Sequence, residues 1–144
     1  MKNLLFFALL SALLFTSCGG DGDSVTGTWI AVSTESTSCD DPDDNQDSAD
    51  FSSEPCTANS PDGCIYASYT FTETTLTTAI SFSIFGVLDS ETDSGTYTID
   101  GDQITVCLDG ECDPATFSID GDTLTIVATD PDDGCVSTLV LNRQ

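Results

Sequence analysis

The side chains that could carry chemistry in this 144-residue chain are seven cysteines and 25 acidic residues, and the chain has no histidine. Nucleophilic catalysis by serine or cysteine needs a neighbouring base, which is usually histidine. Paired carboxylates could still act as acid and base, as they do in glycosidases, but among so many acidic residues two lie close by chance. We therefore expect no enzymatic activity and no bound cofactor.

The first cysteine ends an apolar segment and predicts a lipid anchor. Lys2 precedes the apolar residues 4–15, and Cys18 follows two small residues after them. An apolar run of this length is shorter than the ~20 residues that span a bilayer, and it is typical of a cleaved export signal. It resembles the signal of bacterial lipoproteins, whose first mature cysteine is acylated, although Phe15 replaces the usual leucine. The resemblance implies a signal peptide at 1–17 and a tether with acylated Cys18 at 18–25. The alternative is a secreted protein in which Cys18 is incidental.

The charge of the chain restricts its partners. All 25 acidic residues follow Cys18, so Arg143 is the only formal cation of the mature chain. Such a charge repels nucleic acid and anionic lipid surfaces, whereas it attracts cations and basic proteins. The acidic residues directly after Cys18 resemble export signals of some Gram-negative lipoproteins. We therefore expect the bacterial outer membrane as the location, on either its periplasmic or its cell-surface side, with the lipid bilayer contacted through Cys18.

The other six cysteines favour three disulfides, because they are even in number and the chain is expected to enter an oxidising compartment. Without histidine or a Cys-x-x-Cys pair, no metal centre is expected. If Asp109 and Gly110 form a two-residue turn, Cys107 lies opposite Cys112 in a non-hydrogen-bonded pair about 4.5 Å apart, which a disulfide can span. Three pairings remain for the other four cysteines, and we favour Cys56 with Cys64 and Cys39 with Cys135.

From residue 27 onward, β-branched and aromatic residues alternate with polar ones between breaks of Gly, Asp and Pro, which is typical of β-strands. Residues 99–106 and 119–126 are near copies with Gly-Asp at the centre, and glycine in that position suits a type II′ hairpin turn. The alternation predicts eight strands, at 27–34, 65–72, 75–84, 95–100, 103–108, 112–120, 122–128 and 135–142. Short links favour pairing of neighbours, so we predict an all-β domain at 26–144, an eight-stranded antiparallel up-and-down barrel.

Successive connections in such a barrel alternate between its two ends. The turns at Glu73, Gly101 and Gly121 fall at one end and are short. The other end receives the six cysteines and the long acidic connections 36–63, 86–94, 109–110 and 130–134. The longest of these is an acidic loop between the first two strands that disulfides would order, and such loops often bind partners. Its acidic run at 40–47 could bind Ca²⁺, or it could be a solvated loop.

Gly27-Thr28-Trp29 opens the first strand and resembles the Gly-x-Trp signature of lipocalins. Arg143 follows the last strand, at the same end of the barrel as Trp29, and matches the Trp and Arg pair of that family. Residues 69–77 and 95–102 are likewise similar to bacterial lipocalin-like lipoproteins, which have calycin-type β-barrels. The resemblance implies that Gly27, Trp29 and Arg143 close the barrel, with the cation packed on the indole face. The long acidic loop and the three disulfides depart from the family pattern.

Five aromatic residues are predicted to point into the barrel, where they would either wall a cavity or fill the core: Tyr69, Phe71, Phe82, Tyr97 and Phe117. A cavity of several hundred Å³ favours carriage of a small molecule, whereas a packed interior with an ordered acidic rim favours a protein partner. The first hypothesis is a membrane-anchored, non-catalytic module for a small apolar ligand. The alternative is an inhibitor or adhesion lipoprotein whose acidic rim binds a cationic protein or Ca²⁺.

Overall fold

The computed structural model describes residues 24–132 and 134–144, which form β-strands and one short 3₁₀ helix, η1. The strands are β1 (Gly27–Thr37), β2 (Gln46–Asp50), β3 (Cys64–Phe71), β4 (Thr75–Ile84), β5 (Val87–Asp100), β6 (Gln103–Leu108), β7 (Glu111–Asp120), β8 (Thr123–Thr129) and β9 (Val136–Arg143), and η1 is Pro42–Asp44. Within these residues, no helix is long and apolar enough to cross a membrane.

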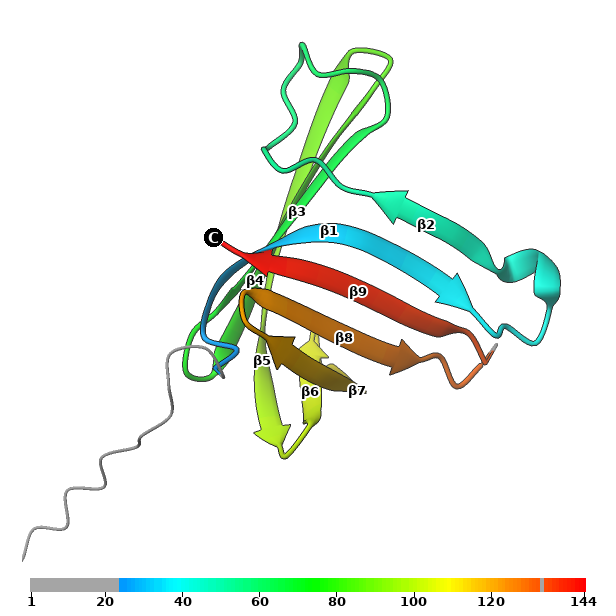
Figure 1. The fold of residues 1–144 in the computed structure, drawn as a ribbon. Helices are drawn as coiled ribbons and strands as arrows, with labels where there is room; N and C mark the ends of the chain where they lie inside the picture. Colours follow the sequence, from blue (N-terminus) through cyan, green and yellow to red (C-terminus); the bar gives the residue numbers. More distant parts are fainter. Residues whose placement is uncertain (1–23, 133) are drawn as a thin grey trace, which may run out of the picture.

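Eight of the strands close into an antiparallel barrel, as the sequence predicts. From β3 to β9 each strand pairs with the next one in sequence. β1 pairs with β3 through Gly27 to Ile30, and on its other side it pairs with β9 from Trp29 opposite Arg143 to Thr37 opposite Val136. Figure 1 shows β1 and β9 side by side at this closure. The all-β class and the barrel topology are therefore confirmed.

The hairpin turns of the two near copies have the expected backbone. Gly101 and Gly121 have φ angles of +65° and +59°, a region that is costly for side chains with a Cβ atom. The flanking pairs are Asp100 opposite Gln103 and Asp120 opposite Thr123, which leaves two residues in each turn. These turns and the one at Glu73 lie at the same end of the barrel as Trp29, and we call this the closed end.

The core lies toward the closed end. Its largest fully buried apolar side chains are Trp29, Phe71, Ile104, Leu124 and Leu141. They come from five different strands and face one another, since alternate residues of each strand point inward. The part of the barrel interior next to the closed end is therefore filled by side chains.

The predicted loop at 36–63 is partly wrong, because it contains η1 and a ninth strand. β2 pairs with β1, with Ser33 opposite Asp50, on the side of β1 away from β9 (Figure 1). β1 has already left β3 at Ile30, so its edge beyond that point is unpaired without β2. Pairing of this edge explains why the acidic, polar sequence of β2 is extended.

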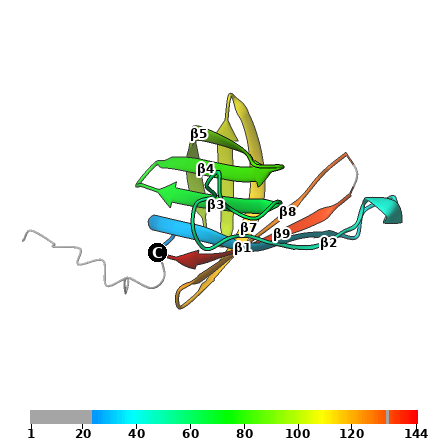
Figure 2. The ribbon, with the colours of Figure 1, turned by 90° about the horizontal axis from the view of Figure 1, so that it is seen from above.

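The predicted connection at 86–94 is also wrong, because residues 87–94 belong to β5. β4 and β5 are joined by only Phe85 and Gly86, and their pairing runs from Ile84 opposite Val87 to Thr75 opposite Thr96. β6 pairs only with Thr96 to Asp100, so the hairpin extends past the end of β6. Figures 1 and 2 show β4 and the start of β5 diverging from β8 and β9. We call residues 80–94 the β4–β5 flap, and the end of the barrel that carries it the open end.

Candidate functional site

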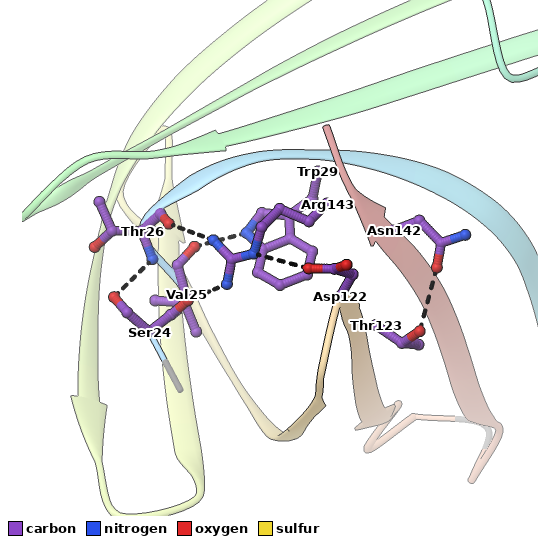
Figure 3. Close-up of polar contacts among 8 residues, drawn as sticks. All are labelled: Ser24, Val25, Thr26, Trp29, Asp122, Thr123, Asn142 and Arg143. Carbon is purple, nitrogen blue, oxygen red and sulfur yellow. Dashed lines mark hydrogen bonds and ion pairs between the residues drawn. The ribbon is translucent and has the colours of Figure 1, made fainter. Parts of the chain in front are cut away.

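The closed end is held by one aromatic ring and one cation (Figure 3). The guanidinium carbon of Arg143 lies 4.1 Å from the ring centroid of Trp29, which is fully buried. The Trp29 Nε1–H group donates to the carbonyl of Val25 at 2.7 Å. Arg143 donates from Nη1 to the carbonyl of Thr26 at 3.1 Å and from Nη2 to that of Ser24 at 2.9 Å. These hydrogen bonds hold the segment before β1 across the closed end of the barrel. The contact of Arg143 with the ring of Trp29 is the one expected from the sequence.

Gly27 is required by this closure. Its φ angle is +129°, and a Cβ atom there would lie 3.2 Å from Nη1 of Arg143. Asp122 lies 4.0 Å from Nε of Arg143 but is 88% exposed, so this ion pair contributes little. The guanidinium is therefore committed to the ring and to two carbonyls, which indicates a structural role.

A hollow of about 640 Å³ lies at the closed end, and it is open to solvent. Val25, Tyr97, Ile99 and Phe117 supply its apolar lining, and Glu73, one serine and three threonines supply the polar part. Tyr97 and Phe117 are two of the five aromatic residues predicted to wall a cavity, but the hollow lies at the closed end, opposite the end where the sequence places the long binding loops. Volumes of about 300 to 1,000 Å³ are usual for small-molecule sites.

The five aromatic residues predicted to point inward have different surroundings. Phe71 and Tyr97 are buried in the core with their rings in a T-shaped contact, 5.2 Å between centroids. Tyr69 and Phe117 are partly buried and pack against that core. Burial raises the pKa of the Tyr69 hydroxyl above 10.0. Phe82 lies on the flap and is outside this core cluster.

Three disulfides lie toward the open end, and their pairings agree with the expectation. Cys107 is directly opposite Cys112 in the β6–β7 register, with Cα atoms 4.0 Å apart. Cys56 is bonded to Cys64, and Cys39 to Cys135. The latter bond joins the loop after β1 to the residue before β9.

Two further contacts order these loops. The Cys56 N–H group donates to Ser81 Oγ at 3.1 Å, which holds the long loop against β4. Asp40 lies so close to Gly134 that an added Cβ atom would be 2.9 Å from its carboxylate. In residues 24–132 and 134–144, no group of three acidic or cysteine residues is arranged to hold a metal ion.

Among the described residues, the three most exposed large apolar side chains are on the flap, and sequence reasoning did not identify this exposed cluster. Ile84, Phe85, Val87 and Leu88 are 48%, 88%, 67% and 43% exposed. They surround the tip of the hairpin, at the open end. Acidic residues follow them along β5 at every second position: Asp89, Glu91 and Asp93. This alternation in the sequence could have indicated the strand, since a period of two places the three carboxylates on one face of a strand.

Cys18 lies outside the described residues, as do the predicted signal peptide and most of the tether. The chain matches no protein-family model and no curated protein in the comparisons. The eight-stranded antiparallel barrel is compatible with a lipocalin-like fold.

Proposed function

We propose that this protein is an exported, lipid-anchored module of the bacterial outer membrane, with a lipocalin-like barrel that binds a cationic protein at its open end. The observation that carries the proposal is the β4–β5 flap, on which exposed apolar residues adjoin Asp89, Glu91 and Asp93. Contiguous exposed apolar surface marks interaction sites, and carboxylates beside it favour a basic partner. The activity is non-catalytic.

The packing of the barrel supports a protein partner over a ligand held inside. Trp29, Phe71, Ile104, Leu124 and Leu141 fill the interior near the closed end. The sequence alone favours a small apolar ligand over a protein partner, whereas this packing favours the protein partner.

The anchor supports the same orientation. Ser24 is fastened at the closed end by Arg143, and Cys18 precedes it by six residues, which reach at most about 20 Å. An acylated Cys18 therefore keeps the closed end near the membrane and directs the open end away from it.

The anchor is tested by metabolic labelling in a bacterial host. Radiolabelled palmitate should be incorporated into the protein and should be lost in Cys18→Ala. Equal labelling of this variant would reject acylation at that position.

The proposed partner class is tested by moving the same change of charge between the two ends. The open-end variant replaces Asp89, Glu91 and Asp93 by Asn, Gln and Asn, and the closed-end control replaces Asp100, Asp102 and Asp120 by Asn. With a basic lysozyme as the probe, we expect calorimetry to show at least about tenfold weaker binding for the open-end variant and little change for the control. Equal effects would mean that only net charge matters, and the proposal would fail.

A small apolar ligand remains the second candidate, because Tyr97 and Phe117 line the hollow at the closed end. The probe is a fluorescent long-chain fatty acid. Phe117→Ala should weaken its binding several-fold, whereas Phe82→Ala on the flap should not. Similar binding to both variants would remove this candidate.

A further inference from the structure

The outer edge of β5 is unpaired over most of the flap. β4 pairs with one edge of β5 from Val87 to Thr96, but β6 begins to pair with the other edge only at Thr96. In the part of the chain that the structure describes, no strand pairs with this edge over residues 87–94. Every residue of that stretch is exposed. The edge is therefore accessible to another extended chain.

The hairpin register identifies the backbone groups that face outward. Ile84 and Val87 flank a two-residue link, so they form a hydrogen-bonded pair, and hydrogen-bonded and non-hydrogen-bonded pairs alternate from there. The N–H and C=O groups that point away from β4 are therefore those of Leu88, Ser90, Thr92 and Ser94. The Ser90 N–H group donates to the Asp89 carboxylate at 2.8 Å. Such a row of groups is a template for strand addition.

The tip of the flap has a residue that local structure does not favour. Phe85 has a φ angle of +52° and is 88% exposed. Glycine and asparagine are preferred in this left-handed region of hairpin turns, and a bulky aromatic residue is disfavoured there. An exposed aromatic ring also lowers the solubility of a protein. Contact with another molecule would account for phenylalanine at this position.

We propose that the edge of β5 from Leu88 to Ser94 accepts an extended, cationic segment of a partner protein as an added strand, with Phe85 packing against the same partner. This inference rests on the proposed function and specifies how the cationic partner docks. The chemistry of the occupant follows from the charges on β5.

Asp89, Glu91 and Asp93 alternate along β5, so they project from one face of the sheet. Opposite charges at facing positions on neighbouring strands are stabilising, whereas like charges are destabilising. A second copy of this edge would place carboxylates against carboxylates, and an anionic membrane surface would be repelled by them. The residues that protect the edge from self-association thus select a basic strand.

The geometry also predicts the sequence pattern of that strand. Only every second side chain of the added strand lies on the face of the three carboxylates, so Lys or Arg is expected at alternate positions. The intervening residues lie beside Leu88, Ser90, Thr92 and Ser94 and are expected to be small or apolar. β6 limits the site at one end, because the Cys107 carbonyl and the Leu108 side chain lie against Gly95. The hairpin tip limits it at the other end.

The test uses a peptide that alternates Lys and Val as the probe. A second peptide of the same charge has proline in place of alternate valines, which prevents strand pairing. We expect the first peptide to bind at least about tenfold more tightly than the second. Hydrogen exchange should show new protection at the amides of Leu88, Thr92 and Ser94.

The matched variants are Thr92→Pro and Thr92→Val. The Thr92 N–H group points away from β4, so proline at this edge position should leave the β4 ladder intact, which amide protection of β4 checks. Thr92→Pro should weaken peptide binding at least about tenfold, while Thr92→Val should not weaken it.

The outcomes separate this inference from the proposed function. If Thr92→Pro binds the peptide as the wild type does, strand addition is wrong, but a partner that depends on the three carboxylates is still supported. If lysozyme binding does not depend on those carboxylates, the proposed function itself fails. Equal binding of uncharged lipid vesicles and the Lys-Val peptide would show that the flap is a membrane contact instead.

Discussion

Arg143 shows how a single cation can be used entirely for structure in a very acidic chain. Its guanidinium covers Trp29 and donates to two backbone carbonyls of the segment before β1. The chain has 25 acidic residues, and among those that the structure describes only the exposed Asp122 lies within ion-pair distance of Arg143. A planar cation on an indole face is stabilised by the ring and by the fork of N–H donors together.

Arg143→Ala should therefore lower the free energy of unfolding by about 1 to 3 kcal/mol, because the ring contact and the hydrogen bonds are lost together. Urea denaturation followed by Trp29 fluorescence measures this loss. Asp122→Asn is the matched control and should change stability little, since an exposed ion pair contributes little. A loss as large in the control would mean that the ion pair, and not the ring contact, holds the base.

Tyr69 should make stability depend on alkaline pH. Burial raises its pKa above 10.0 because the phenolate is poorly solvated in the fold. The stabilising contribution of neutral Tyr69 is fully present below pH 10.0, the unfolded value, and is lost as pH rises through the folded-state pKa.

Tyr69→Phe should remove this dependence. Denaturation midpoints at about pH 9 and about pH 11 should fall less for the variant than for the wild type, and absorbance at alkaline pH should lack its late-titrating phenol. Parallel declines in the two proteins would contradict the assignment to Tyr69.

The strands could be predicted where side-chain alternation and turn chemistry agree. The registers around Gly101 and Gly121, the pair of Cys107 with Cys112 and the closure of β1 on β9 all follow from short links and chain order. The first part of β5 was missed because Asp, Glu and Ser are poor strand formers by propensity. Pairing with β4 overrides that propensity, and the same holds for β2 against β1.

The candidate site could likewise be predicted only in part. Trp29 and Arg143 could be placed together because they lie at the two ends of the chain, on adjacent strands of a closed barrel. The flap could not be found from composition, since it exists because β5 continues along β4 beyond the end of β6. The end of β6 at Leu108 was predicted from the turn at Asp109 and Gly110, but the pairing of residues 87–94 with β4 beyond that end was not, because their acidic sequence does not indicate a strand.

The disulfides of the open end should differ in their contribution to stability. Cys39 and Cys135 are 96 residues apart in sequence, whereas Cys56 and Cys64 are 8 apart. A longer closed loop removes more entropy from the unfolded chain. Replacing the Cys39–Cys135 pair by alanines should cost about 2 kcal/mol more than replacing the Cys56–Cys64 pair.

Chemical denaturation of the two double variants measures this difference, with mass spectrometry to verify that the other bonds remain. The Cys56–Cys64 variant serves as the control for loss of a buried disulfide in the same region. Equal costs would show that local packing, and not loop closure, determines the stability that each bond provides.

The distribution of charge gives the molecule a polarity from one end to the other. The closed end carries Arg143 together with five acidic residues at its turns, while the flap and the cysteine-bearing loops at the open end carry acidic residues and no cation. The formal net charge of −23 that would attract the proposed basic partner also causes repulsion within the folded protein.

That repulsion predicts a specific dependence of stability on salt. The Debye length falls from about 30 Å at about 0.01 M salt to about 10 Å at about 0.1 M, so repulsion between carboxylates on different loops should be largely screened over that range. The melting temperature should rise steeply up to about 0.1 to 0.3 M NaCl and then level off, since further salt only shortens an already small screening distance. Preferential exclusion of salt from the surface would instead give a rise that continues to high concentration, and sodium sulfate should show that continuing rise as a comparison.

The open-end variant at Asp89, Glu91 and Asp93 carries three fewer charges and should show a smaller early rise than the wild type. Calorimetric melting at increasing NaCl concentration measures both rises. An early rise of the same size in the variant would mean that the flap carboxylates do not contribute to the repulsion.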